Sequence, residues 1–411
     1  MIKLANPGFL FFAKWLFIVF AVALAVGSTS ACFLYLLNRV TALREEHLFI
    51  ILFLPVVGLL LSWWYQRYGG KVQKGNNLLL LEYYRPDDGI PFRMAPMIIL
   101  ATLATHLFGG SAGREGTAVQ YGASIADQLR KVVSLTKEEK RTLLLCGIAA
   151  GFASLFGTPW AGALFALEMV QLGRTRWKGI VPIVGTAYLS NIICGLYGDL
   201  HTHYPQLGGL PHLSPKVLVY LIAAGLAFGL AARLFCKSGD LFNALFSKIR
   251  QPLFRPVVGG VAVVATVFLL QSTRHIGLGI PTILSAFETP LPSYDFLIKI
   301  ILTTLTLSAG FKGGEVTPLF FVGATLGNAL APFIPLPMIL LAATGFVSVF
   351  AGCTKTPIAC TVMAMELFGL EGALFFFITC MVSLIVSGKE GIYSAQKSHT
   401  PGRLIKRVFR S

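Results

Sequence analysis

A glycine-rich stretch, Gly109-Gly-Ser-Ala-Gly-Arg-Glu-Gly-Thr117, interrupts a long apolar part of this sequence. It places a carboxylate, Glu115, among small residues and between segments that are apolar enough to lie in a bilayer. An ionisable side chain at membrane depth is costly and is usually functional. Glycines leave backbone N–H groups uncovered and let a ligand approach the main chain closely. The stretch therefore predicts a functional site at a break between two helices.

The composition indicates an integral membrane protein. The 411 residues are 55% hydrophobic and 13% charged, and the mean hydropathy is +0.72. The first apolar segment runs too long for a signal peptide and lacks a small-residue cleavage site, so we expect a retained helix. The alternation typical of membrane strands is absent, so the expected fold is all-α and polytopic. Segments long enough, or nearly so, to cross a hydrocarbon core of about 30 Å are Leu10–Leu37, Leu48–Trp64, Val217–Ala232 and Val257–Leu270.

The net charge of +16 belongs mainly to loops and tails. Lys and Arg gather at residues 67–74, 130–141, 174–178 and 397–410. Positive loops that face the cytoplasm explain this pattern, so we expect no nucleic-acid partner. The seven cysteines lie mostly in apolar runs without a CxxC pair, which indicates buried hydrophobic side chains. His201, His203 and His212 lie in a polar region that offers no completed ligand set, so we expect a hydrated loop, no metal and no cofactor.

The second half of the sequence repeats the pattern of the first. Internal repeats with interrupted helices are typical of transporters whose binding site lies near the middle of the membrane. We therefore expect a single transmembrane transporter domain over residues 1–411, with repeat halves at about 70–205 and 210–395. Glu115 and Glu315 should meet near the interface of the halves. The echoes, about 200 residues apart and in the same order, are Gly113–Thr117 with Gly313–Thr317, Gly122-Ala123 with Gly323-Ala324, Gly151–Phe156 with Gly345–Phe350, and Thr158-Pro159 plus Glu168 with Thr356-Pro357 plus Glu366.

Short apolar segments beside the glycine breaks are expected to be half-helices. Broken helices are tolerated in a membrane where the exposed backbone lines a cavity within the protein. Asn76 begins another short run, and its side chain is expected to cap that helix, at a place that attracts anions. The half-helices are Met94–His106 and Ala118–Leu129 around Glu115, and Thr142–Phe156 and Ala161–Gln171 around Gly157–Pro159.

The residues around the two glutamates suit a passing anion. Apart from Glu115 and Glu315, the surrounding runs offer Asn, Thr, Tyr and backbone N–H groups, which replace part of the water shell of an anion without trapping it. A lone carboxylate repels an anion when ionised and admits it when protonated, which would couple anion and proton movement. The alternative for Glu115 is a structural pair with Arg114. Glu168 and Glu366 are interpreted as structural groups that satisfy polar neighbours.

These motifs resemble the CLC family of chloride channels and proton-coupled anion antiporters over about residues 70–395. The resemblance implies that Glu115 is the gating and proton-transferring glutamate, and that Gly113, Gly116, Gly313 and Gly314 form the motif backbone. It also implies a homodimer without the soluble regulatory domain that some members carry. The matching stretches are Gly113–Gly116 with the GREGP motif, Gly313–Pro318 with GGxFxP, Gly75–Leu79 with GSGIP, and Ile392–Ser394 with the segment of the anion-coordinating tyrosine.

Departures from these motifs resemble the fluoride/proton antiporter branch, CLC-F. Asn76 stands where chloride and nitrate members have serine or proline, and Met169 stands where chloride/proton members carry a second glutamate for internal protons. Fluoride is small and strongly hydrated, so it requires N–H or O–H donors at short range. Phe321 is either an edge donor to the anion or a core residue. The residues expected to bind the anion are Asn76, Val316, Thr317, Phe321 and Tyr393, with Glu315 as a possible coupling residue.

The resemblance implies a multi-pass protein of the bacterial inner membrane that exports cytoplasmic fluoride in exchange for protons. A chloride transporter or a passive anion channel is the first alternative. An intramembrane enzyme with Glu115 and Glu315 as an acid/base pair is a remote one, because the sequence has no HExxH motif and no other nucleophile constellation that supports it. The fluoride-to-proton stoichiometry, the selectivity over chloride and the internal proton route stay open at this stage.

Overall fold

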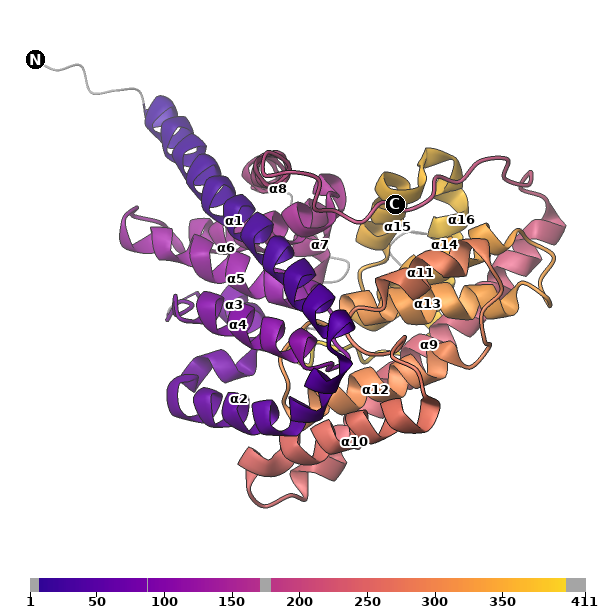
Figure 1. Cartoon of the computed structure of the whole chain (residues 1–411). Coiled ribbons are helices and arrows are strands. Elements are labelled where there is room, and N and C mark those ends of the chain that lie inside the picture. Colours follow the sequence, from indigo (N-terminus) through magenta and orange to yellow (C-terminus); the bar gives the residue numbers. More distant parts are fainter. Residues whose placement is uncertain (1–6, 87, 171–178, 397–411) are drawn as a thin grey trace, which may run out of the picture.

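The computed structural model describes residues 7–86, 88–170 and 179–396, and in these residues it has helices and no strands (Figure 1). The all-α prediction is therefore confirmed. In the first half the helices are α1 (Pro7–Glu46), η1 (Leu48–Phe53), α2 (Leu54–Tyr68), η2 (Gly70–Lys74), α3 (Asn76–Tyr84), α4 (Met94–Leu107), α5 (Glu115–Asp127), η3 (Gln128–Lys131), α6 (Lys137–Phe156), α7 (Pro159–Val170) and α8 (Ile180–Gly195). In the second half they are α9 (Pro215–Ser247), η4 (Pro252–Phe254), α10 (Arg255–Leu270), α11 (Ile280–Glu288), α12 (Asp295–Ala309), α13 (Val316–Leu330), α14 (Met338–Thr354), α15 (Pro357–Phe368), η5 (Leu370–Gly372) and α16 (Ala373–Val386).

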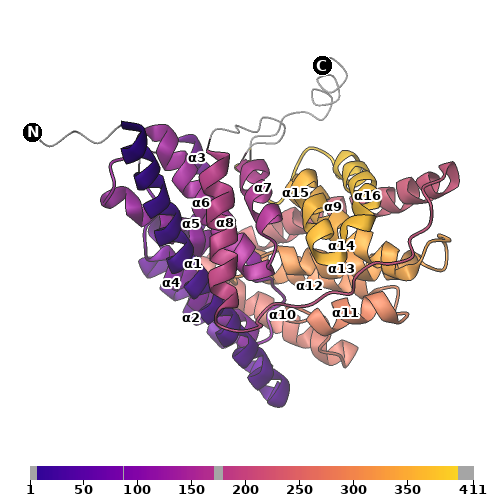
Figure 2. The same ribbon diagram turned by 90° about the horizontal axis from the view of Figure 1, so that it is seen from above.

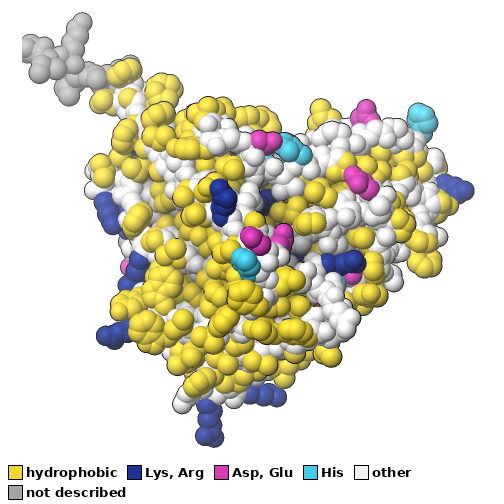
Figure 3. All heavy atoms as spheres, viewed as in Figure 1, with side chains coloured by type: hydrophobic (Ala, Val, Ile, Leu, Met, Phe, Trp, Pro, Cys, Tyr) yellow, Lys and Arg dark blue, Asp and Glu magenta, His cyan; other side chains and the backbone are white. Residues whose placement is uncertain are grey.

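Several helical stretches are long and apolar enough to cross a membrane. Each of them contains one of the four spans expected from hydropathy. Hydrophobic side chains cover much of the face shown in Figure 3, and Phe12, Leu16 and Phe20 on α1 are each more than half exposed, at 64%, 60% and 55%. Apolar surface of this extent is unfavourable in water and is suited to lipid. The stretches are Gly8–Glu46, Leu48–Tyr68, Pro215–Ser247 and Pro252–Leu270.

The two halves of the chain lie side by side. In both views α1 to α8 gather on one side and α9 to α16 on the other (Figures 1 and 2). The helix-free segment 196–214, which contains the three histidines, runs across the molecule to reach α9. Its middle is anchored by the backbone N–H of Leu207, which donates to the carbonyl of Phe368 at the end of α15. The expected loop is thus present and bridges the two halves.

Helices inside each half approach one another through glycine. A Cβ on Gly122 of α5 would lie 2.3 Å from the carbonyl oxygen of Gly147 in α6. A Cβ on Gly323 of α13 would lie 2.0 Å from the carbonyl oxygen of Gly345 in α14. No side chain fits at these distances, so the small residues allow the close helix contacts that stabilise membrane proteins. The same device packs α5 on α6 and α13 on α14.

Two carboxylates join α7 and α15 reciprocally. Glu168, near the end of α7, accepts hydrogen bonds from two backbone N–H groups at the start of α15, the shorter from Ala359 at 2.7 Å. Glu366, near the end of α15, accepts two from the start of α7, the shorter from Ala161 at 2.9 Å. A carboxylate at a helix N-terminus satisfies free N–H groups and interacts favourably with the helix dipole. The structural interpretation of both glutamates agrees with this arrangement.

Four helix starts differ from the sequence expectation. Helix α6 begins at Lys137 and not at Thr142, and α7 begins at Pro159 and not at Ala161. Helix α5 begins at Glu115 and not at Ala118, so the glutamate is part of the helix instead of the preceding loop. Helix α3 has Gly75 as its N-cap, with φ +54°, and no side chain caps it. Glycine adopts this left-handed backbone most readily, so it takes the position that Asn76 was expected to serve. The capping prediction for Asn76 is wrong. The basic clusters at residues 174–178 and 397–410 lie outside the described residues.

Candidate functional site

The two glycine-rich motifs lie back to back at the centre of the molecule. Gly113 and Gly314 form an antiparallel bridge in which each N–H donates to the carbonyl of the other, at 2.5 and 2.7 Å. A Cβ on Gly314 would lie 2.5 Å from the backbone nitrogen of Gly116, so side chains are excluded here. The bridge brings together the N-termini of α5 and α13, where Glu115 is the first residue of α5 and Glu315 is the N-cap of α13.

The carboxylate of Glu115 is fully buried and is held by donors from both halves. Its Oε2 accepts hydrogen bonds from the backbone N–H of Thr317 at 3.0 Å and of Arg114 at 3.1 Å. Its Oε1 accepts a hydrogen bond from the hydroxyl of Thr317. Backbone N–H groups at a helix start attract negative charge in general, so the same donors suit a small anion. The alternative role expected for Glu115 was an ion pair with Arg114. This pair is present as a looser contact, since Nε of Arg114 lies 3.6 Å from Oε1 of Glu115.

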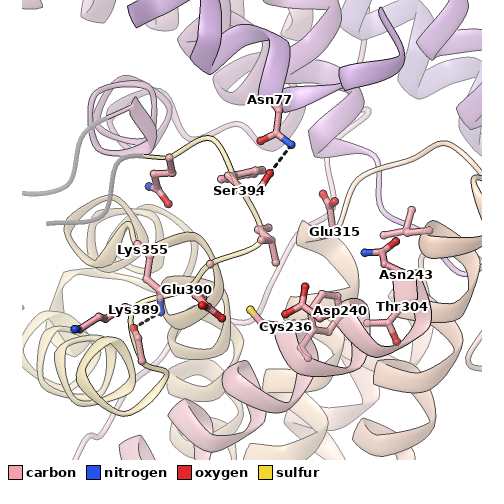
Figure 4. Close-up of a pocket in the computed structure, with 18 of the residues that line it drawn as sticks. Asn77, Cys236, Asp240, Asn243, Thr304, Glu315, Lys355, Lys389, Glu390 and Ser394 are labelled. Carbon is pink, nitrogen blue, oxygen red and sulfur yellow. Dashed lines mark hydrogen bonds between the residues drawn. The ribbon is translucent and has the colours of Figure 1, made fainter. Parts of the chain in front are cut away.

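A cavity of about 670 Å³ reaches this centre from the side of the α16 C-terminus. We call it the larger cavity, because a second, smaller one lies nearby. In Figure 4, Asn77 and Ser394 lie at one end of the larger cavity, joined by their hydrogen bond. Asp240 of α9 lies toward the other end, and Glu315 lies between them on one side in this view. Lys355 also lines the cavity, with its ammonium donating to Ser387 Oγ and to a backbone carbonyl. The larger cavity thus carries both signs of charge.

A second cavity, of about 170 Å³, lies beside the start of α3. It is lined by Asn76, Glu315 and Tyr393, among other residues. Glu315 and Tyr393 line both cavities and therefore stand between them. Together with the motif glycine Gly313, four of the predicted site residues meet at this smaller cavity, while Thr317 contacts Glu115 directly.

The segment that carries Tyr393 is held against α3. The side chain of Asn77 donates from Nδ2 to Ser394 Oγ at 3.0 Å, and its Oδ1 accepts from the backbone N–H of Ala395 at 3.0 Å. The two bonded residues, Ser394 and Ala395, directly follow Tyr393 in the sequence. The tyrosine itself is buried, with 5% exposure. Sequence analysis missed this role of Asn77. The available signal was the pair of adjacent asparagines at the start of α3.

Phe321 is directed away from these cavities. Its ring centroid lies 5.9 Å from that of His275, and the ammonium of Lys299 lies 5.1 Å from it, over the ring. It lines neither the larger nor the smaller cavity. These contacts favour the core-packing alternative over an edge contact to an anion. Val316 is likewise buried, as the first residue of α13.

Sequence analysis also missed Lys312, which directly precedes the Gly313-Gly314 pair. Lys312 and Tyr65 both line the smaller cavity, and the ammonium lies 4.6 Å from the centre of the tyrosine ring. A lysine at membrane depth beside a motif is the signal that could have identified it.

The sequence matches the profile of the voltage-gated chloride channel family over residues 57–388. The chain belongs to this family. The family resemblance and the CLC-type fold expected from the sequence are confirmed. A relative from Pseudomonas syringae pv. tomato, described as a chloride/fluoride channel protein, is 45% identical over 395 residues, which cover 94% of this chain and 87% of the relative.

Solved structures agree with the membership in the voltage-gated chloride channel family. A crystal structure of a CLC-type fluoride/proton antiporter superposes with a TM-score of 0.91 and 37% identity, covering 94% of this chain and 98% of that chain. The structure of a slow cyanobacterial Cl⁻/H⁺ antiporter gives a TM-score of 0.76 at 19% identity, over 97% and 99% of the two chains, which is a likeness of fold. This chloride channel family member is therefore a helical membrane protein of an ion-transporting family.

A methionine, Met169, follows Glu168 near the end of α7. Met169 is fully buried and brings no ionisable group to the end of α7. Two of the three histidines of the connecting loop are engaged elsewhere: His201 Nε2 bonds the carbonyl of Ser154 at 2.9 Å, and His203 bonds a carboxylate of its own loop. Among the described residues, no three His, Cys, Asp or Glu side chains cluster as metal ligands.

Proposed function

We propose that this chloride channel family member exports cytoplasmic fluoride in exchange for protons across a bacterial inner membrane. The observation that carries the proposal is the hydrogen bonding of Glu115. Its ionised carboxylate would occupy the N–H and hydroxyl of Thr317, which are donors that a small anion needs. Protonation would weaken this hold and leave the donors to the anion, so one residue would link the two movements. The similarity to a fluoride/proton antiporter supports fluoride as the anion.

The proposed cycle has three steps. Protonated Glu115 leaves the Thr317 donors, fluoride enters from between Asn76 and Tyr393, and the deprotonated carboxylate later displaces it. Fluoride suits hard O–H and N–H donors at short distances, and the residues that surround the path offer these groups. Glu315 is proposed to assist the coupling, because its Oε2 is buried, has no hydrogen-bond partner in the described chain and lines both cavities.

We also propose that residues 1–411 act as one transmembrane domain made of two repeat halves, and that two copies form a homodimer with one pathway each. The equivalent glycine contacts of α5 with α6 and of α13 with α14 support the repeat. The reciprocal contacts of Glu168 and Glu366 support it as well. The homodimer rests on the family resemblance, and chemical cross-linking in native membranes followed by mass determination tests it. The proposal assigns the chain no enzymatic activity.

Reconstitution in liposomes tests the transport proposal. Vesicles loaded with fluoride or with chloride are compared side by side, and anion efflux and proton uptake are recorded with electrodes. The wild type should release fluoride faster than chloride and drive protons uphill on a fluoride gradient. Glu115→Gln should lose this proton pumping, whereas Glu168→Gln serves as a control with a buried glutamate outside the gate. Uphill proton movement by Glu115→Gln would refute the mechanism.

A passive anion pathway is the second candidate. It is favoured by Met169, because a buried methionine offers no carboxylate for protons on the internal side. The same vesicles distinguish the two candidates, since a passive pathway releases fluoride or chloride without proton uptake.

A further inference from the structure

Two cysteines from distant parts of the sequence meet at the wall of the larger cavity. Cys236 of α9 is half-buried and lines this cavity, and in the view of Figure 4 it lies between Glu390 and Asp240. Cys353, near the end of α14, is buried, and the two thiols are hydrogen-bonding partners of each other. An accessible thiol that stands beside a second thiol is the arrangement typical of redox-sensing cysteines.

The packing of α14 on α9 brings these thiols together. The Sγ of Cys353 donates to the carbonyl of Ala232, one turn before Cys236 on α9, at 3.4 Å. A Cβ on Gly352 would lie 2.8 Å from the Cβ of Ala232, so this glycine lets the two helices approach closely. The pairing therefore results from helix packing, and the two thiols stay together as long as the fold is intact.

Two other cysteines lack access to the cavity. Cys360 of α15 and Cys380 of α16 are fully buried and line neither the larger nor the smaller cavity. Each is paired with a hydroxyl, Cys360 with that of Thr356 and Cys380 with that of Ser348. Oxidation of cysteine depends on exposure of the thiol, so an oxidant in water reaches Cys236 and is excluded from these two.

Cys353 is also attached to the segment that carries Tyr393. Its carbonyl oxygen accepts a hydrogen bond of 3.0 Å from the backbone N–H of Ile392. A Cβ on Gly391 would lie 2.7 Å from the same oxygen, so the segment runs in tight contact with Cys353. Tyr393 follows directly in the sequence and lines both cavities. A displacement of Cys353 is therefore passed on to Tyr393.

The larger cavity faces a compartment in which a disulfide is temporary. Asn77 lines this cavity and follows the basic segment 67–74, and positive segments favour the cytoplasmic side. Thiols in the cytoplasm are kept reduced, and disulfides that form there are usually transient and often redox-sensing. The reduced pair is therefore the resting state, which an oxidant converts.

We propose that Cys236 and Cys353 form a thiol switch, in which hydrogen peroxide in the larger cavity oxidises the pair to a disulfide that slows anion transport. The thiolate of Cys236 attacks a peroxide oxygen, which gives a sulfenic acid and a hydroxide. The thiolate of Cys353 then attacks this sulfur, and the disulfide forms as a second hydroxide leaves. The two hydroxides take up the protons of the two thiols, so two thiols are oxidised and one peroxide is reduced to two waters.

The disulfide acts on transport because it moves Cys353. A disulfide bond holds two sulfurs closer together than a hydrogen bond between thiols does, so oxidation draws Cys353 toward α9. The hydrogen bond from Ile392 to Cys353 is then lost or strained, and Tyr393 is displaced from its place between the two cavities. A thiol reductant reverses the change by exchange with the disulfide.

Peroxide treatment of the full-length protein in liposomes tests the thiol switch. Free thiols are alkylated after the treatment, and peptide mass spectrometry should find Cys236 linked to Cys353. Fluoride efflux should fall about threefold or more, as for the loss of a hydrogen bond that positions Tyr393, and dithiothreitol should restore it. Cys236→Ser should form no linked peptide and should keep its untreated rate in peroxide. Cys360→Ser is the matched control and should respond as the wild type does.

Three outcomes would overturn the thiol switch. The first is a sulfenic acid on Cys236 without the link to Cys353, and the second is a linked peptide with unchanged efflux. The third is inhibition by peroxide that persists in Cys236→Ser, because oxidation of another residue would then be the cause. Cys353→Ser should behave as Cys236→Ser does. If the buried Cys353→Ser variant does not fold, Cys236→Ser on the cavity wall decides alone.

The effect on fluoride transport rests on the proposed function, whereas the mass readout does not. If the wild type exchanges fluoride for protons but the pair stays reduced in peroxide, only the thiol switch fails. If the wild type moves chloride and no fluoride, the fluoride proposal fails, and chloride efflux before and after peroxide decides the switch. A reversible fall of chloride efflux that requires Cys236 would support the switch, and an unchanged chloride rate would refute it.

Discussion

The carboxylate of Glu115 accepts a hydrogen bond of 3.0 Å from the backbone N–H of Thr317, although 202 positions separate the two residues. This bond joins the start of α5 in the first half to the start of α13 in the second. The proposed gate of one half is therefore held by donors of the other half. Release of Glu115 must alter the interface between the two halves, and not only one side chain.

The hydroxyl of Thr317 should contribute to anion binding separately from its N–H. We expect Thr317→Val to weaken fluoride binding about tenfold, because a hydrogen bond to a charged group contributes about 1.5–3 kcal/mol. Thr317→Ser keeps the hydroxyl and should bind as the wild type does. Both changes are made in a Glu115→Gln background, which removes competition by the carboxylate, and fluoride is titrated by calorimetry. Equal affinities of the Val and Ser variants would contradict a role of the hydroxyl.

The contact of the two motifs should tolerate no added methyl group at Gly314. A Cβ there would lie 2.5 Å from the backbone nitrogen of Gly116, and backbone cannot move aside easily. Gly314→Ala should lower the free energy of unfolding by about 1–3 kcal/mol, and thermal unfolding in detergent measures this. In Gly116→Ala the added Cβ would lie 3.0 Å from its nearest neighbouring atom, so this variant should lose less stability. Gly208→Ala has nothing within 4 Å and is the neutral control; a Gly314→Ala protein as stable as this control would refute the prediction.

Glu168 and Glu366 should act on stability and not on coupling. Each carboxylate accepts two backbone N–H bonds from the other helix, so Glu168→Gln and Glu366→Gln should each cost about 1 kcal/mol, as the loss of a helix cap does. Melting temperatures should fall in both variants while the ratio of protons to fluoride in vesicles stays at the wild-type value. Loss of proton coupling in Glu168→Gln at an unchanged melting temperature would show a transport role instead.

Asn77 should act through Tyr393. Asn77→Ala removes both hydrogen bonds to the residues that follow the tyrosine, so the tyrosine is held less firmly and fluoride affinity should fall by about threefold or more. Asn243→Ala is the matched control, because Asn243 lines the same cavity and makes no side-chain hydrogen bond in the described chain. Fluoride titration compares the two variants, and equal affinities would mean that the clamp on Tyr393 is dispensable.

Much of the architecture could be predicted because it depends on local properties of the chain. The long spans follow from hydrophobic length, and each of the four expected spans lies within one long helical stretch. The breaks beside Glu115 and Glu315 follow from glycine, which admits close backbone approach. The structural role of Glu168 and Glu366 could be inferred from their symmetric positions after the Thr-Pro breaks. Repetition of a pattern needs no knowledge of the fold to be recognised.

The details of the site could not be predicted in the same way. Asn76 was expected to cap α3, but Gly75 is the N-cap and the asparagine Oδ1 is left without a partner beside the smaller cavity. Phe321, one helical turn after Thr317, packs on Lys299 and lines neither cavity. A position within one turn of a motif does not define which side of the helix faces the path, because neighbouring helices decide what each side contacts.

The sequence by itself determined that this chain is a repeated, broken-helix membrane protein with a costly carboxylate at each central break. Only the tertiary structure decided that Thr317 holds Glu115, and that Lys312, Tyr65 and Asn76 surround one cavity beside Glu315. The physical reason is distance along the chain. Hydropathy and glycine act within a few residues, whereas hydrogen-bond partners at this centre come from segments that meet only when the two halves pack together.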